Sequence, residues 1–177
     1  MIVQLIAMAM LAVSTSSSRC VLHQPFDSTA NATVIDEFRA PACERCAGNR
    51  GIEFSLRQGS SLFSASDGVV SFSGRVGQVE YLVIATNFNR RITYGRIESS
   101  VVRVGDRVRA GQRVAVSTNS FYFGVREVDG AQVRYVDPNR YLDTSATFAK
   151  TVLVRDENAF HGGRSERSSR TALANAC

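Results

Sequence analysis

The segment VRVGDRVRAGQRVA, residues 102–115, places two glycine turns inside a run of valines that alternate with charged residues. The turns fall at Gly105–Asp106 and Ala110–Gly111. Alternation of apolar and polar residues gives a strand one buried and one exposed face, and glycine permits tight reversals between strands. The segment therefore predicts short β-strands that turn back on one another.

The same pattern extends in both directions along the chain. Short apolar runs such as VEYLVIA, residues 79–85, are separated by turn residues, and Asp129–Gly130 stands between two runs, as in a hairpin. Asp137–Pro138 predicts a capped helical turn. No long stretch has helical periodicity. We therefore expect an all-β domain at 34–143, a short-stranded antiparallel sandwich or barrel with flexible termini.

The flanks of this domain lack its pattern. Residues 1–18 begin with an apolar run too short for an ordinary transmembrane helix and end in small residues, which predicts a signal peptide. An uncleaved anchor and the absence of any targeting role are the alternatives. Residues 19–33 are predicted to be a linker, and 144–177 a C-terminal extension, mostly disordered from about residue 156. We expect a secreted or cell-envelope protein without a stable transmembrane span after cleavage.

The composition limits the partners. The 177-residue chain has a formal net charge of +5 at pH 7, which favours anionic surfaces in general. It has no basic helix and no nucleic-acid-binding motif, so we expect no nucleic acid partner. Lys150, the only lysine, lies beyond the β domain. The sequence therefore argues against a lipoyl or biotinyl carrier, which needs a lysine at a hairpin tip.

Cys43 and Cys46 form a C-x-x-C motif in a loop that contains Pro and Gly. A structural zinc site would need two further ligands at suitable spacing, and the chain offers no second such motif. An exported protein can form disulfides. We therefore favour a disulfide that pins the loop, with free thiols, or metal or redox chemistry, as alternatives.

Four segments, in this order and spacing, carry a resemblance to a known family: ASDGVVSFSG, ITYGRI, VRVGDRVRAGQRVA and YVDPNRYL. They resemble the lysostaphin-like, LytM-type zinc metalloendopeptidases that cut peptidoglycan cross-bridges. The resemblance covers residues 34–142. It implies the family's duplicated hybrid motif fold, with a groove over one β-sheet and a metal ion at the base of the groove.

The resemblance also implies where the family's site residues should stand. The first zinc-binding histidine corresponds to Asn49, the zinc-binding aspartate to Glu53, and the last zinc-binding histidine to Tyr122. The two catalytic histidines correspond to Arg96 and Ser120. Every histidine that the family uses is therefore replaced in this chain.

The chemistry of these replacements argues against a zinc site. The chain's two histidines, His23 and His161, lie outside the β domain. An amide and a phenol are weak zinc ligands at neutral pH, and an arginine repels a cation. We therefore expect no zinc cofactor. Three alternatives remain for Glu53: a solvated carboxylate, an ion pair with Arg96 inside the groove, or a metal ligand.

The strands that would form the floor of the groove are rich in aromatic residues. By alternation, Ser120 and Tyr122 face one side of their strand, and Phe121 and Phe123 face the other side, which we assign to the core. Tyr122 either fills the former metal cavity or forms a platform for a ligand. The residues expected to line the groove are Asn49, Glu53, Tyr94, Arg96, Ser120 and Tyr122.

These observations favour a non-catalytic LytM-like domain, a pseudoenzyme of the cell envelope. Its expected partner is a peptidoglycan peptide or a cell-wall hydrolase that it regulates. One alternative is an active peptidoglycan metalloendopeptidase with an atypical metal site. A further alternative is a structural extracellular β domain. The missing histidines argue against enzyme activity but leave the question open.

Overall fold

The computed structural model describes residues 21–43 and 45–142. The predicted signal peptide at 1–18 and the predicted extension at 144–177 lie outside the described residues. Within the described part, the structure contains no helix that is both long and apolar enough to cross a membrane.

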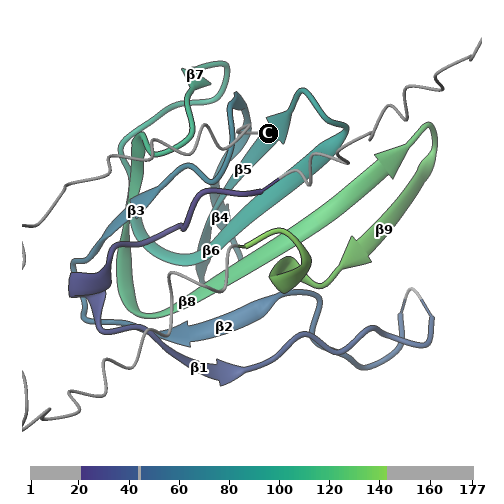
Figure 1. The fold of residues 1–177 in the computed structure, drawn as a ribbon, viewed down its shortest axis with the longest axis horizontal. Coiled ribbons are helices and arrows are strands. Elements are labelled where there is room, and N and C mark those ends of the chain that lie inside the picture. The colour runs from purple at the N-terminus through teal and green to yellow at the C-terminus, as the bar shows by residue number, and fades with distance from the viewer. Residues whose placement is uncertain (1–20, 44, 143–177) are drawn as a thin grey trace, which may run out of the picture.

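One antiparallel sheet organises the described part of the chain (Figure 1). Its strands follow the order β1-β2-β8-β6-β5-β4-β7, and β3 and β9 also pair with β8. The long strand β8 therefore joins most of the fold, and the predicted all-β class is confirmed. The elements are η1 (Ser28–Ala30), β1 (Thr33–Asp36), β2 (Ile52–Ser55), β3 (Ser61–Phe63), β4 (Gly68–Val76), β5 (Val79–Thr86), β6 (Arg90–Ser100), β7 (Arg107–Val108), β8 (Arg113–Asp129), β9 (Gln132–Val136) and η2 (Pro138–Arg140).

Residues 102–115 form two turns, strand β7 and the start of β8, as the glycines predicted. Gly105 and Gly111 have φ angles of 93° and 77°, in the left-handed region that favours glycine. The valine pattern is followed only in part. Val108 is buried in the strand, whereas Val104 is 60% exposed because it stands in the first turn.

Two other local predictions are confirmed. Strands β8 and β9 form a hairpin in which Asp129 pairs with Gln132, and Gly130 in the turn has a φ angle of 55°. The η2 turn begins after Asp137, whose side chain accepts a hydrogen bond of 3.0 Å from the Asn139 N–H. Both features confirm that the turn chemistry could be interpreted correctly from local sequence.

The core lies against one face of β8. Phe121, Phe123 and Val125 are fully buried, as their alternation with Ser120 and Tyr122 predicted. The ring of Phe121 lies 6.2 Å from the ring of Phe123. Aromatic rings of this size bury a large apolar area and so contribute strongly to stability. The opposite face of β8 is consequently free to carry the polar residues of a site.

The prediction that Tyr94 lines the groove is wrong. Tyr94 is fully buried, because alternation along β6 turns it to the core face, opposite Phe123 in the strand register. Its hydroxyl oxygen accepts a hydrogen bond of 2.7 Å from the Ala65 N–H, and burial raises the pKa of the phenol well above its usual value. Tyr94 is therefore a core residue whose polar end is satisfied.

The segment predicted to be a linker at 19–33 contributes to the core. Leu22, Phe26 and Ala30 are buried in the cluster around β8, and Phe26 packs edge-on against Phe54 with 5.0 Å between ring centroids. The segment has no strand or helix period, so its spaced apolar residues gave no signal. Its described part packs on the sheet rather than serving as a loose connection.

Candidate functional site

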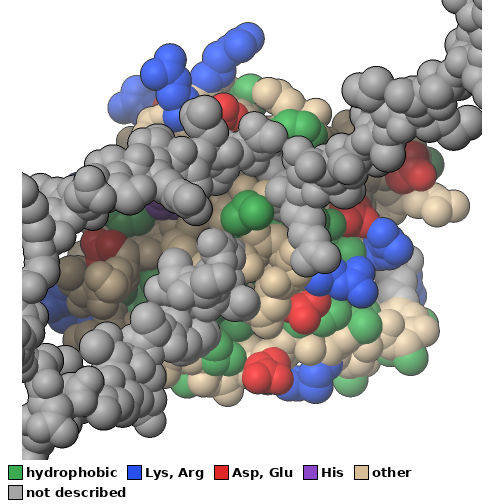
Figure 2. Space-filling model, viewed as in Figure 1, with side chains coloured by type: hydrophobic (Ala, Val, Ile, Leu, Met, Phe, Trp, Pro, Cys, Tyr) green, Lys and Arg blue, Asp and Glu red, His purple; other side chains and the backbone are tan. Residues whose placement is uncertain are grey.

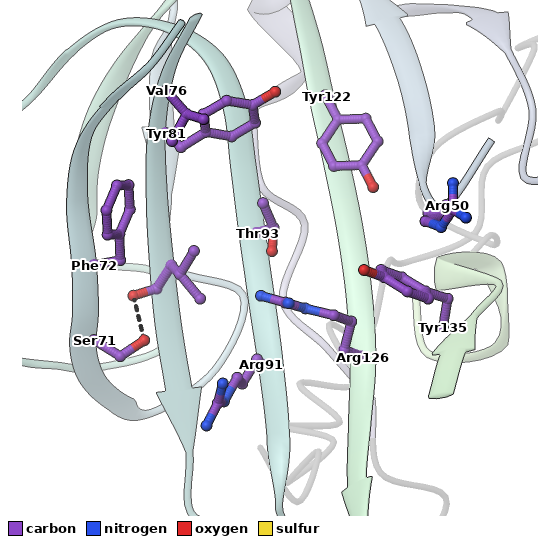
Figure 3. A pocket seen from close by; sticks show the side chains of 11 residues that line it. Arg50, Ser71, Phe72, Val76, Tyr81, Arg91, Thr93, Tyr122, Arg126 and Tyr135 are labelled. Atoms are coloured by element: carbon purple, nitrogen blue, oxygen red, sulfur yellow. Dashed lines mark hydrogen bonds between the residues drawn. The ribbon is translucent and has the colours of Figure 1, made fainter. Parts of the chain in front are cut away.

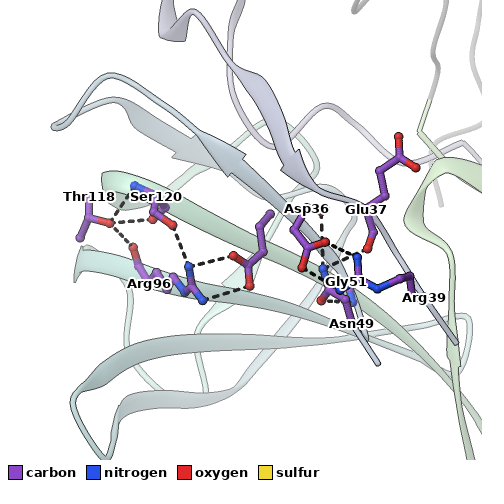
Figure 4. A network of polar contacts seen from close by, with 9 residues as sticks. Asp36, Glu37, Arg39, Asn49, Gly51, Arg96, Thr118 and Ser120 are labelled. Atoms are coloured by element: carbon purple, nitrogen blue, oxygen red, sulfur yellow. Dashed lines mark hydrogen bonds and ion pairs between the residues drawn. The ribbon is translucent and has the colours of Figure 1, made fainter. Parts of the chain in front are cut away.

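Strands β2, β8 and β6 bring three polar side chains together on one face of the sheet (Figure 4). Arg96 forms a bidentate ion pair with Glu53, with Nη1 2.8 Å from Oε2 and Nη2 donating to Oε1 at 3.0 Å. The Nη1 group also donates to the Ser120 hydroxyl at 3.0 Å. We call Glu53, Arg96 and Ser120 the clamp. Of the three alternatives for Glu53, the structure shows the ion pair.

A bulge in β6 aims Arg96 into the clamp. The register is shifted between Gly95, which pairs with Tyr122, and Ile97, which pairs with Ser117. Arg96 is the residue between them and has a φ angle of 56°, unusual for a residue with a side chain. Regular alternation would send it to the core side, where the buried Ile97 lies. The bulge instead turns the guanidinium toward Glu53.

Thr118 supports this bulge from β8. Its hydroxyl lies 2.8 Å from the Arg96 carbonyl oxygen and 2.6 Å from the Ser120 carbonyl oxygen, and can donate to one of them at a time. The same oxygen accepts a hydrogen bond of 3.2 Å from the Ser120 N–H. Residues with positive φ cost free energy and persist only where their surroundings hold them. Thr118 provides part of that support.

Asn49 is buried away from the clamp and holds a turn (Figure 4). Its amide nitrogen donates to the Glu37 carbonyl oxygen at 3.1 Å, and its amide oxygen accepts from the Gly51 N–H at 3.4 Å. Its backbone pairs with Arg39 in both directions. Both ends of the amide are therefore occupied by backbone, so Asn49 does not line a groove as the resemblance implied.

Tyr122 lies in a cradle made by three glycines. A Cβ atom at Gly51, Gly95 or Gly124 would stand 2.7 to 3.2 Å from atoms of the Tyr122 side chain. The phenol therefore occupies space that side chains at these positions would otherwise fill. Burial is the main cause that raises the pKa of Tyr122 to about 12, with nearby Tyr135 adding to the shift. The hydroxyl is neutral near pH 7.

The side chains at the positions that correspond to the zinc ligands of LytM-type enzymes do not fit a zinc ion. The Asn49 amide is bound to backbone, both oxygens of Glu53 are bound by Arg96, and the Tyr122 phenol keeps its proton. Zinc sites need deprotonated or neutral donors with free lone pairs, arranged around one point. Among residues 21–43 and 45–142, no group of three or more His, Cys, Asp or Glu is placed to hold a metal ion.

A groove of about 750 Å³ opens over β4, β5, β6, β8 and β9, and one of its walls is Tyr122 (Figure 3). Its lining combines aromatic rings with arginines and includes no Asp or Glu. Of the six residues expected to line a groove, Tyr122 does so, and the clamp lies beside it on the same face. The lining residues are Arg50, Ser71, Phe72, Val76, Tyr81, Val83, Arg91, Thr93, Tyr122, Arg126 and Tyr135.

The C-x-x-C motif forms a disulfide between Cys43 and Cys46, as predicted. The carbonyl oxygen of Cys46 accepts a hydrogen bond of 3.3 Å from the Arg50 side chain. A second hollow of about 780 Å³ borders this loop and shares Arg50 and Arg126 with the groove. The disulfide loop thus reaches the edge of the groove and contacts one of its arginines.

Sequence reasoning missed the arginines of the groove. The alternation that placed Tyr122 on the groove face also places Arg126 there, four residues along β8. In the same way, Arg91 shares a face of β6 with Thr93 and Gly95. The missing information was the register between β6 and β8, which local sequence does not supply.

Comparison with known proteins supports the same fold. The sequence model of peptidase family M23 matches residues 47–137, just over half of the chain. The chain belongs to peptidase family M23. The M23 match contains the three clamp residues and every strand that forms the groove, whereas Cys43 and Cys46 both lie before its first residue.

Proteins similar to this chain are covered by it to very different extents. An uncharacterized metalloprotease of Haemophilus influenzae is 28% identical over 86 residues, which cover 46% of this chain and 18% of that protein. Helicobacter pylori Csd3 superposes with a TM-score of 0.60 at 22% identity, covering 71% of this chain and 35% of that one. A chain of the SpoIIIAH–SpoIIQ complex gives a TM-score of 0.59 at 14% identity, covering 68% and 99%. The chain thus spans about a fifth to a third of the first two.

Proposed function

We propose that this chain is a non-catalytic M23 domain of the cell envelope that binds a peptidoglycan peptide or a cell-wall hydrolase. The observation that carries the proposal is the bidentate pair between Glu53 and Arg96. A peptidase of this family would need its carboxylate free for zinc. Here the carboxylate is held by a guanidinium on both oxygens, so the fold is retained with different chemistry at its centre.

A zinc ion could bind Glu53 only by displacing Arg96. The displaced guanidinium would still be tethered to β6, within a few ångströms of a divalent cation. Like charges at such distances repel by several kcal/mol at the effective dielectric of a protein surface, about 20. Neither Asn49 nor Tyr122 offers an anionic ligand to compensate. We therefore propose that the domain takes no stoichiometric zinc at these positions.

Two features support a binding role over a purely structural one. The groove is lined by aromatic and cationic side chains from several strands. A structurally similar chain also occurs in an assembly of two proteins, the SpoIIIAH–SpoIIQ complex. Concave surfaces with aromatic walls and a few polar groups are the usual form of ligand sites. The wall ligand and the extracytoplasmic location follow from the resemblance to LytM-type enzymes.

The proposal is tested with purified full chain in three measurements. Elemental analysis after gel filtration should find well under one zinc per chain. Incubation with peptidoglycan sacculi should release no new peptides, with or without added zinc. In a pull-down, either the sacculi should retain the protein, or the immobilised protein should retain a cell-wall hydrolase. Zinc near one per chain that is lost in Glu53→Ala, together with chelator-sensitive cleavage, would show an active peptidase instead.

A further inference from the structure

Two arginines stand directly opposite each other on the groove face. Arg91 of β6 pairs with Arg126 of β8 in the strand register, and both line the groove. Side chains of such cross-strand partners begin about 5 Å apart, and like charges there are destabilising. No ion pair joins either arginine to another residue in the described part of the chain. The fold therefore keeps two cations together without an acid between them.

Three other arginines of the sheet, Arg75, Arg96 and Arg134, have acidic partners. Arg75 pairs with Glu80, and Arg134 forms an ion pair with Glu127. Glu127 follows Arg126 in β8 and lies on the opposite face of that strand. Glu127 also accepts a hydrogen bond from Tyr141. A carboxylate is thus available one position along the strand, but alternation turns it away from the groove. The pair Arg91–Arg126 is left facing an open surface that lacks acids.

The Arg126 guanidinium is supported by an aromatic ring. It lies 5.9 Å from the centre of the Tyr135 ring, and Arg50 lies 5.4 Å from the same ring. Figure 3 shows Arg126 extended from β8 across β6 toward the middle of the groove, with Tyr135 beside it. Stacking against an aromatic ring limits the rotamers of an arginine while leaving its N–H groups available. The donors are therefore partly preorganised.

We propose that Arg91 and Arg126 form a carboxylate-binding subsite for an acidic peptide that lies in the groove. The inference rests on the proposed function, because it names the ligand group that the same groove recognises. A guanidinium matches a carboxylate with two parallel N–H···O bonds, and two guanidiniums can share one carboxylate. The peptide then continues over the apolar surface of Tyr81, Tyr122 and Phe72.

Arg96 does not fill this role, although it replaces a family catalytic histidine. Both oxygens of Glu53 occupy its guanidinium, so a ligand carboxylate would have to displace an internal one. Arg91 and Arg126 have no such competitor among the described residues. The groove is also within the 300–1,000 Å³ that ligand sites commonly occupy, at about 750 Å³. This volume suits a short peptide segment.

The test uses soluble peptides from digested sacculi, either with free carboxylates or with those carboxylates amidated. Calorimetric titration of the full chain should give binding of the free form that weakens at least about tenfold in Arg126→Gln and in Arg91→Gln, the size expected for hydrogen bonds to a charged group. Amidation should weaken binding to the parent at least as much as either substitution does, and should not weaken binding to the double variant Arg91→Gln/Arg126→Gln any further. Arg113→Gln, an exposed arginine of β8 outside the groove, is the matched control and should bind within about twofold of the parent.

The outcomes separate the two proposals. If the peptide affinity changes neither on amidation nor in the two groove variants, the carboxylate subsite is overturned while the binding function stands. No binding by the parent or by any variant, together with no retention on sacculi, overturns wall binding and the subsite with it. Inorganic phosphate that competes as strongly as the free peptide would show a general anion site and would also overturn the peptide assignment. Thermal melts of each variant verify that it is folded.

Discussion

Two ends of one sheet face use arginine in opposite ways. At the clamp, Arg96 meets Glu53, and the two charges satisfy each other. Five residues back along β6, Arg91 meets Arg126, and no ion pair in the described part of the chain neutralises them. The same side chain is a structural cross-link where an acid faces it, and an available cation where none does. One end of the face therefore carries a structural ion pair, and the other end carries the subsite that we propose for a ligand carboxylate.

Tyr122 separates the two ends. Its ring covers Gly95 and Gly124 between the clamp and the arginine pair, where larger residues would fill the floor. Because the phenol stays neutral at ordinary pH, it adds apolar surface without adding charge. The clamp can therefore hold the strands while the arginine pair faces the solvent, and variants at each end should have separate effects.

Filling the cradle between the two ends should have the largest effect on stability. In Gly51→Ala, the new Cβ would stand 2.4 Å from the Phe123 carbonyl oxygen, so backbone must move. We expect a loss of about 3 kcal/mol in the free energy of unfolding, at the upper end for overpacking. Gly124→Ala is the comparison variant, because its closest contact, at 2.7 Å, is the end of the Tyr122 side chain. Urea unfolding should rank Gly51→Ala as clearly the less stable.

An equal loss in the two glycine variants would mean that the Tyr122 ring is held as rigidly as backbone. That result would mean that the packing of Tyr122 in its cradle, rather than the clamp, holds this face of the sheet rigid. A small loss in Gly51→Ala would contradict the close approach of the strands at this position.

Breaking the clamp should have an intermediate effect. Arg96→Gln leaves the largely buried Glu53 carboxylate, 18% exposed, without its cation. Because Arg96 itself is 44% exposed, solvent screening limits the loss to about 1–2 kcal/mol. A double-mutant cycle with Glu53→Gln, measured by urea unfolding, should give a favourable coupling of about 1 kcal/mol. A coupling near zero would show that the pair is formed but contributes nothing.

Much of the fold could be predicted from the sequence because it depends on local chemistry. The glycines of residues 102–115 specify turns, and alternation around Phe121 specifies the core face of β8. The same alternation would have placed Tyr94 correctly, since Thr93 and Gly95 beside it face the groove. The residues around Tyr94 alternate between the two faces of β6, so the motif as a whole does not line the groove.

The site could be predicted only where single positions decide its chemistry. Histidine replacement is visible in the sequence, and so is the possibility of a pair between Glu53 and Arg96. Whether their side chains form the ion pair depends on a bulge at Arg96, which local sequence does not predict. The opposition of Arg91 and Arg126 depends on strand register, a non-local property. Long-range pairing therefore limits what the sequence alone can reveal here.

Relieving the repulsion at the arginine pair should have the smallest effect and the opposite sign. Arg91→Gln removes one of two like charges and keeps a long polar side chain, so the protein should gain about 0.2–1 kcal/mol of unfolding free energy at low salt. Arg126→Gln should gain less, because it also loses its contact with the Tyr135 ring. The double variant should gain no more than the better single one, since either change already ends the repulsion. High salt should erase the gain by screening, and Arg113→Gln should stay near zero throughout. A loss above about 0.5 kcal/mol in Arg91→Gln would mean that the arginine stabilises the fold, and the contrast between the two ends of the face would fail.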